Sequence, residues 1–223
     1  MPGTQLGLDA AVDLTRTGDV WLFRGHTAAD RLIQVSTNSP VNHVGMSVTI
    51  EDLPALMWHA ELGRSLPDLW SGVHRRGAQL HDLRSAVLVW ATKYDQRLWL
   101  RQLDCPRTRD MEDAVLRTIA RLDGTPFPSR FRLVTRWLSG RVPVRKRASW
   151  RGELETAYCA EIVAITYEEM GLLPPSHRPN WYDAGRFWSG DHLNLAAGTV
   201  LGEEIAVSVP PGTSAVASMT PAN

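Results

Sequence analysis

A cysteine thiol and the imidazole rings that could activate it are the side chains of this sequence best suited to nucleophilic chemistry. The chain contains two cysteines, Cys105 and Cys159, and seven histidines. Cys159 lies near the start of a helix expected over 156–170, where exposed backbone N–H groups and the helix dipole favour an anion and lower the pKa of a thiol. Cys159 is therefore the candidate nucleophile, and an inert buried thiol is the alternative. Cys105 lies in a turn-like Asp-Cys-Pro sequence and is expected to be structural.

A thiol nucleophile needs a base and a group that orients the base. His43 lies on a strand expected over 41–50 and is the candidate base. His59 lies on the next apolar run, 55–62, where its side chain could orient a neighbouring imidazole. Glu61 follows on the same face of that run and is the competing orienting group.

The surrounding elements predict an α+β fold, because strands come first and the main helix comes late. The expected strands are 18–24, 41–50, 55–62, 77–83, 86–90 and 202–209, and the expected helices are 28–37, 111–122 and 156–170. Residues 1–17 are expected to form a leader, 18–209 a single domain, and 210–223 a disordered tail rich in Pro, Ser, Thr and Ala.

Composition excludes several classes of protein. Hydrophobic residues make up 43% of the chain and charged residues 22%, which excludes global disorder. Lys plus Arg and Asp plus Glu both number 24, so a general polyanion binder is not expected. Two cysteines cannot form a disulfide framework or a four-thiolate zinc site. The N-terminus has no signal-peptide pattern and no run is long enough to span a membrane, so a cytoplasmic protein is expected.

Four short motifs together resemble one enzyme family. They are Gly18-Asp19-Val20-Trp21-Leu22-Phe23-Arg24, Asn42-His43-Val44-Gly45-Met46, Gly124-Thr125-Pro126-Phe127 and Tyr158-Cys159-Ala160-Glu161-Ile162-Val163. The pattern resembles the circularly permuted papain-like hydrolases, the YiiX-type branch of the NlpC superfamily, which are related to lecithin:retinol acyltransferase-like enzymes. In that group the histidine strand precedes the cysteine helix, as His43 precedes Cys159 here.

The resemblance implies a permuted papain-like fold in which an antiparallel sheet packs against the helix that carries the cysteine. It implies that Cys159 is the nucleophile, that His43 is the general base and that His59 occupies the orienting position, where many relatives have glutamate. Tyr158 or nearby backbone N–H groups are candidates for the oxyanion site. The activity implied is hydrolysis or acyl transfer at an amide or ester bond through an acyl-enzyme, with a peptide, a lipid or another small molecule as substrate.

Other motifs favour neither a cofactor nor a metal. The sequence contains no His-Glu-x-x-His, no Gly-x-Gly-x-x-Gly at the start of a helix and no phosphate-binding loop. His59-Ala60-Glu61 resembles half of a zinc deaminase motif, but Pro-Cys-x-x-Cys does not follow it. A non-catalytic module that binds a lipid or peptide is the rival interpretation, suggested by histidine at the orienting position.

The segment 130–151 concentrates positive charge. It holds eight basic residues and no acidic one, with apolar residues at helical spacing. This pattern predicts an amphipathic helix that could contact an anionic membrane surface, and an ordinary surface helix is the alternative. Nucleic-acid binding is not expected, because aromatic residues are not interleaved as stacking platforms.

Overall fold

The computed structural model describes residues 5–26, 39–50, 53–124, 150–196 and 198–210, without the side chains of 150–157. The strands are β1 (Gln5–Gly7), β2 (Val20–Arg24), β3 (His43–Val48), β4 (Leu56–Glu61), β5 (Gly77–Asp82), β6 (Arg97–Arg101), β7 (Leu103–Asp104), β8 (Val200–Leu201) and β9 (Ile205–Ser208). The α-helices are α1 (Leu8–Leu14), α3 (Leu83–Thr92), α4 (Arg109–Leu122) and α6 (Trp150–Glu169). No helix within these residues is both long and apolar enough to cross a membrane.

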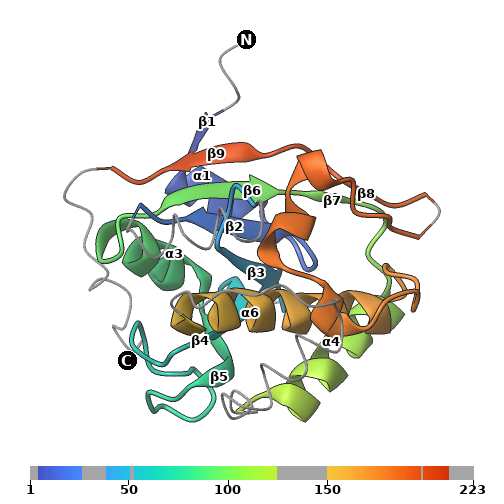
Figure 1. Cartoon of the computed structure of the whole chain (residues 1–223), viewed down its shortest axis with the longest axis horizontal. Coiled ribbons are helices and arrows are strands. Elements are labelled where there is room, and N and C mark those ends of the chain that lie inside the picture. The colour runs from blue at the N-terminus through green and yellow to red at the C-terminus, as the bar shows by residue number, and fades with distance from the viewer. Residues whose placement is uncertain (1–4, 27–38, 51–52, 125–149, 197, 211–223) are drawn as a thin grey trace.

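A seven-stranded sheet organises the molecule (Figure 1). The strand order is β1-β9-β6-β2-β3-β4-β5, and β7 and β8 pair separately. Neighbouring strands are antiparallel except β1 and β9, which are parallel. The α+β class is therefore confirmed, with one parallel pair at the edge of a sheet that was expected to be antiparallel.

The central strands are buried on both faces, and their alternating residues divide between two layers of helices. On β3, Val44 and Met46 belong to the cluster that includes residues of α6. Side chains alternate along a strand, so His43 and Gly45 point to the opposite face. That opposite face packs against α1 and α3, through a second cluster that includes Phe23 and Trp90. The sheet thus separates an α6 side from an α3 side.

One expected strand is a helix. Residues 86–90 were expected to form a buried strand but lie inside α3. Asp82 caps this helix, since its carboxylate accepts a hydrogen bond from the backbone N–H of Ser85 at 2.8 Å. A short apolar run does not distinguish a buried strand from a buried helix, which is why the sequence pattern was misleading.

The helix that carries Cys159 begins earlier than expected. It starts at Trp150 instead of Thr156 and ends at Glu169. Glu153, Leu154 and Glu155 are good helix formers, and no proline interrupts the segment, so nothing in the sequence stops the helix at 156. Cys159 therefore lies in the middle of α6, away from the exposed N–H groups of its first turn.

The N-terminal segment contributes to the fold. Part of the expected leader, residues 5–14, forms β1 and α1. β1 pairs with β9 at the sheet edge, and Leu8 and Ala11 of α1 are buried. The expected helix 28–37, the basic segment 130–149 and the tail 211–223 lie outside the described residues.

Gly45 allows two neighbouring strands to approach closely on the α3 side. A Cβ atom there would overlap the sulfur of Met57 and lie 3.3 Å from the Cβ of His59. Gly45→Ala is therefore expected to lower the free energy of unfolding by about 1–3 kcal/mol. Urea denaturation measures this, with Gly7→Ala as the control, because nothing lies within 4 Å of a Cβ at Gly7. Equal midpoints for the two variants would contradict the prediction.

Candidate active site

Three buried histidines form a chain across three adjacent strands on the α3 side of the sheet. His43 lies on β3, His59 on β4 and His81 on β5. The Nε2 atom of His43 lies 3.0 Å from Nδ1 of His59, and Nε2 of His59 lies 2.8 Å from Nδ1 of His81. Each ring is about 1% exposed. The structure therefore brings together both histidines predicted for the site and adds a third.

The two contacts restrict where the ring protons can be. A neutral imidazole has one donor and one acceptor nitrogen, so each contact needs N–H on one side and a lone pair on the other. Either all three rings carry hydrogen on Nε2, or all three carry it on Nδ1. The terminal atoms, Nδ1 of His43 and Nε2 of His81, are buried and form no hydrogen bond with another side chain within the described part of the chain. In the Nε2–H arrangement, His43 therefore presents an unused lone pair.

Aromatic side chains pack against the row of three histidines and shield it from water. The ring of His43 stacks on Trp90 of α3 with centroids 4.0 Å apart, and Phe23 of β2 lies 5.5 Å from it. Burial lowers the pKa of His43 to about 3. Burial also lowers the pKa of His59, and the neighbouring rings of His81 and His43 add to the effect. The pKa of His81 falls to about 4 through burial, although the charge of Asp68 opposes the shift. All three rings are neutral at pH 7.

Glu61 follows His59 on the same face of β4 but does not take the orienting position beside His43. Its carboxylate accepts hydrogen bonds from the backbone N–H of Ser65 at 3.3 Å and from the Ser65 hydroxyl. Burial raises the pKa of Glu61. Of the two orienting groups considered from the sequence, His59 is the one in hydrogen-bond contact with His43.

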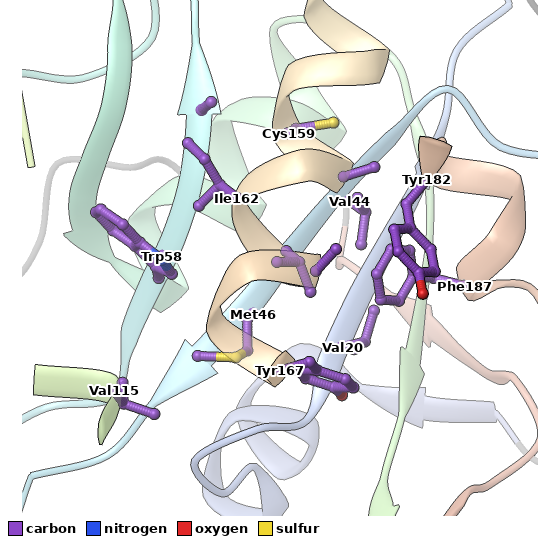
Figure 2. Close-up of a cluster of buried hydrophobic side chains, with 14 of the residues drawn as sticks. Val20, Val44, Met46, Trp58, Val115, Cys159, Ile162, Tyr167, Tyr182 and Phe187 are labelled. Atoms are coloured by element: carbon purple, nitrogen blue, oxygen red, sulfur yellow. The ribbon is translucent and has the colours of Figure 1, made fainter. Parts of the chain in front are cut away.

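Cys159 lies on the α6 side of the sheet. It is fully buried in the cluster that includes Val44 and Tyr182, at the end away from Tyr167 (Figure 2). Neither cysteine forms a disulfide. Val44 belongs to the same cluster as Cys159. His43 precedes Val44 and is the first residue of β3, so its ring points to the other face of the sheet. No hydrogen bond joins the thiol to His43, because Nδ1 of that ring has no partner and Nε2 contacts His59.

The mid-helix position of Cys159 changes two expectations. In the interior of an α-helix, backbone N–H groups bond to carbonyls four residues earlier, so those near Tyr158 are unavailable to an oxyanion. The macrodipole acts within the first turn, so Cys159 lies outside the part of α6 where it favours an anion. Tyr158 is buried in the same cluster as Cys159, with 6% of its surface exposed. Its predicted role now depends on the hydroxyl alone.

No model of a known protein family and no curated protein sequence matches the chain. One solved structure with a similar arrangement is that of metalloprotein YiiX from Escherichia coli O157:H7. The two share 17% identity with a TM-score of 0.44. The match covers 70% of this chain and 66% of YiiX, just under two thirds. This likeness is too distant to assign any side chain a role.

Neither His81 nor Trp90 can be selected as a site residue from the sequence alone. His81 alternates with Leu80 on β5, and this alternation indicates its face but not its neighbour. Its contact with His59 depends on the β4–β5 register, in which Met57 lies opposite His81. The sequence predicts a strand over 86–90, and this prediction does not place Trp90 on the ring of His43.

Removing the indole should change the ionisation of His43. Trp90→Leu is expected to raise the pKa of His43 from about 3 toward its ordinary value, because water would reach a ring that Trp90 now covers. NMR titration of the ring protons measures the shift. Trp99→Leu is the matched control, since Trp99 packs against Trp188, in the other cluster. An equal pKa of His43 in both variants would show that Trp90 is not the cause of its desolvation.

Proposed function

We propose that this protein is a thiol-dependent hydrolase or acyltransferase acting on an amide or ester bond. In this proposal Cys159 is the nucleophile, His43 is the general base and His59 is the positioning residue. The observation that carries it is the state of the His43 ring. His59 contacts Nε2 at 3.0 Å, while Nδ1 is buried and has no hydrogen-bond partner among the described residues. His43 is the first residue of β3, which packs against α6, the helix of Cys159.

The proposed reaction begins with proton transfer from the thiol to Nδ1 of His43. The sulfur then forms a bond to the carbonyl carbon, and the C=O electron pair moves to oxygen. When the tetrahedral intermediate collapses, the bond to the amine or alcohol breaks and His43 returns the proton to that leaving group. Water or an amine then attacks the thioester, and His43 accepts the proton of this second nucleophile. When this second intermediate collapses, the carbonyl re-forms, the C–S bond breaks and His43 returns the proton to the sulfur.

His59 supports this cycle through a single hydrogen bond. With hydrogen on Nε2 of His43, Nδ1 of His59 accepts it and holds the ring with Nδ1 available. When His43 becomes an imidazolium, the same acceptor remains in contact with the positive ring, although a neutral imidazole stabilises it less than a carboxylate would. Because burial lowers the pKa of His43 to about 3, the resting imidazole is neutral and able to accept a proton. The proton therefore moves during the reaction and not before it.

The proposed reaction requires the side chains of Cys159 and His43 to move. Thiol and ring lie on either side of the first residue of β3, so the Cys159 side chain and the His43 ring must approach each other past the end of that strand. Bound substrate would favour this arrangement if it contacts both groups only when they are together.

The test is trapping of an acyl-enzyme from a panel of activated thioesters, esters and amides. The proposal predicts a covalent acyl group on Cys159, found by peptide mass spectrometry in wild type and in Cys105→Ser but not in Cys159→Ser. Cys105 is partly exposed and serves as the internal control. Acylation of Cys105 alone would refute the assignment of the nucleophile.

A non-catalytic module that binds a lipid or peptide is the second candidate. It is favoured by the full burial of Cys159 among apolar side chains. Absence of turnover on the whole panel, combined with lipid or peptide binding that Cys159→Ala leaves unchanged, would support this candidate over the hydrolase.

A further inference from the structure

The far end of the histidine chain carries a set of atoms that the proposed reaction does not use. One ligand atom each from His59, Glu61 and His81 lie within 4.8 Å of one another. The three side chains come from adjacent strands β4 and β5 and are no more than 2% exposed. Two imidazoles and one carboxylate on a rigid pair of strands are a ligand set that zinc commonly binds.

The polar atoms of this set are incompletely satisfied. The carboxylate of Glu61 is held by the backbone N–H and hydroxyl of Ser65, which are both neutral donors and cannot cancel a buried negative charge. A buried charge without a compensating cation is costly, and a divalent cation between the carboxylate and the imidazoles would remove that cost.

We propose that His59, Glu61 and His81 bind one zinc ion, and that zinc locks the histidine chain in the tautomer that cannot deprotonate Cys159. The binding site stands on its own geometry, whereas the inhibition rests on the proposed thiol hydrolase function. The site is distinct from the thiol, which lies on the other side of the sheet.

The geometry requires a small opening of the cluster. The facing atoms, Nε2 of His59 and Nδ1 of His81, are 2.8 Å apart. Two nitrogens on a tetrahedral zinc are about 3.4 Å apart, because each Zn–N bond is about 2.0–2.1 Å. The rings must therefore separate by about 0.6 Å, and the hydrogen bond between them is replaced by two bonds to the metal. Water would complete the coordination.

The inhibition follows from counting ring protons. Zinc on Nε2 of His59 takes the lone pair of that atom, so the one ring hydrogen of His59 must move to Nδ1. That Nδ1–H then donates to Nε2 of His43, which must act as acceptor and carry its own hydrogen on Nδ1. No proton leaves the histidines, but the Nδ1 lone pair that would accept the thiol proton is lost. Zinc binding at one end of the chain thus disables the base at the other.

Metal binding is tested first on the full-length wild-type protein. Apoprotein prepared with a chelator is expected to bind one equivalent of Zn²⁺ in competition with a chromophoric chelator. Co²⁺ in place of zinc is expected to give the visible bands of a four-coordinate nitrogen and oxygen site. The absence of a specific equivalent, or a thiolate-to-cobalt charge-transfer band, would overturn the site, and neither result requires a variant to fold.

Variants then test the ligands. His81→Gln and Glu61→Gln are each expected to weaken zinc binding about 100-fold or more, since even loss of a partner that only orients a ligand costs up to about 100-fold. His177→Gln is the control, because His177 is an exposed histidine that stacks on Trp181 outside the cluster. Zinc affinity unchanged in both cluster variants would overturn the assignment of the ligands.

The inhibition is tested separately from the catalysis. Zinc is expected to abolish wild-type turnover at one equivalent, whereas His81→Gln is expected to need about 100-fold more zinc for the same loss. Zinc titration of Cys159→Ser measures binding without any turnover. Metal binding with no turnover by the apoprotein would refute only the proposed hydrolase. Turnover that one bound equivalent leaves unchanged would refute only the inhibition.

Discussion

His43→Gln is expected to lower kcat/KM for a thioester or ester substrate by about 10³-fold, within the range that a general base contributes. Glutamine keeps a donor that can contact His59 but has no basic nitrogen to accept the thiol proton. Steady-state kinetics on the substrate that acylates the wild type fastest measure the effect, in the presence of a chelator.

Two further variants identify the reason for this loss. His59→Gln is expected to lower kcat/KM by about 10-fold to 100-fold, because a side-chain amide still accepts the Nε2–H bond but holds the ring less well. His177→Gln is the control and should have the kcat/KM of the wild type, since this exposed side chain stacks on Trp181 and does not belong to the row of three histidines. If His43→Gln and His177→Gln have the same kcat/KM, His43 is not the base.

Acid should lower the free energy of unfolding of this protein between about pH 6.5 and pH 4. The pKa of His43 in the folded state is about 3 and that of His81 is about 4, both below the ordinary value of 6.5. At pH values between these folded-state pKa values and 6.5, the histidines bind protons in the unfolded chain but not in the folded protein. Stability is therefore complete above about pH 6.5 and falls as the pH decreases through this window.

The magnitude is large enough to measure by chemical denaturation. Each of these histidines removes about 1.4 kcal/mol per pH unit of unfolding free energy below about pH 6. His59 acts in the same direction, because burial also lowers its pKa. Urea unfolding of the apoprotein at pH 7, 6 and 5 measures the slope. His81→Gln should remove one contribution, whereas His177→Gln should not, and a free energy independent of pH over this range would contradict the prediction.

Strand alternation explains why much of the fold was predictable. The sequence predicts β2, β3, β4 and β5 within a few residues. β3 shows the alternation of a strand, whereas β2 and β4 are short apolar runs. α4 was also predicted, since apolar residues recur at helical spacing from Met111 to Leu122. The α+β class follows from these elements.

The predicted secondary structure is wrong where the local sequence pattern does not determine which tertiary contacts form. The Val/Leu-rich run at 86–90 fits a strand or a buried helix equally well, and only the cap at Asp82 favours the helix. β6 was not predicted, although it pairs with both β2 and β9. Its apolar run is only three residues long, Leu98 to Leu100, and is flanked by Arg97 and Arg101.

The candidate site was predictable only in part. His43 and His59 were selected from their strands, and the structure joins them directly. His81 could not be selected, because its contact with His59 depends on the register between β4 and β5. The proposed metal ligands are not found by a motif search for the same reason, since Glu61 and His81 come from different strands and no fixed spacing relates them. The assignment of Cys159 remains a prediction.

The proposed reaction requires the thiol of Cys159 and Nδ1 of His43 to come within reach of proton transfer. Treatment with dibromoacetone tests it directly, because this reagent alkylates a thiol and can then bridge it to an imidazole close by. We expect a cross-linked peptide pair that contains Cys159 and His43 and that is absent in Cys159→Ser and in His43→Gln. Alkylation of Cys159 with no bridge, or with a bridge to a different histidine, would contradict it.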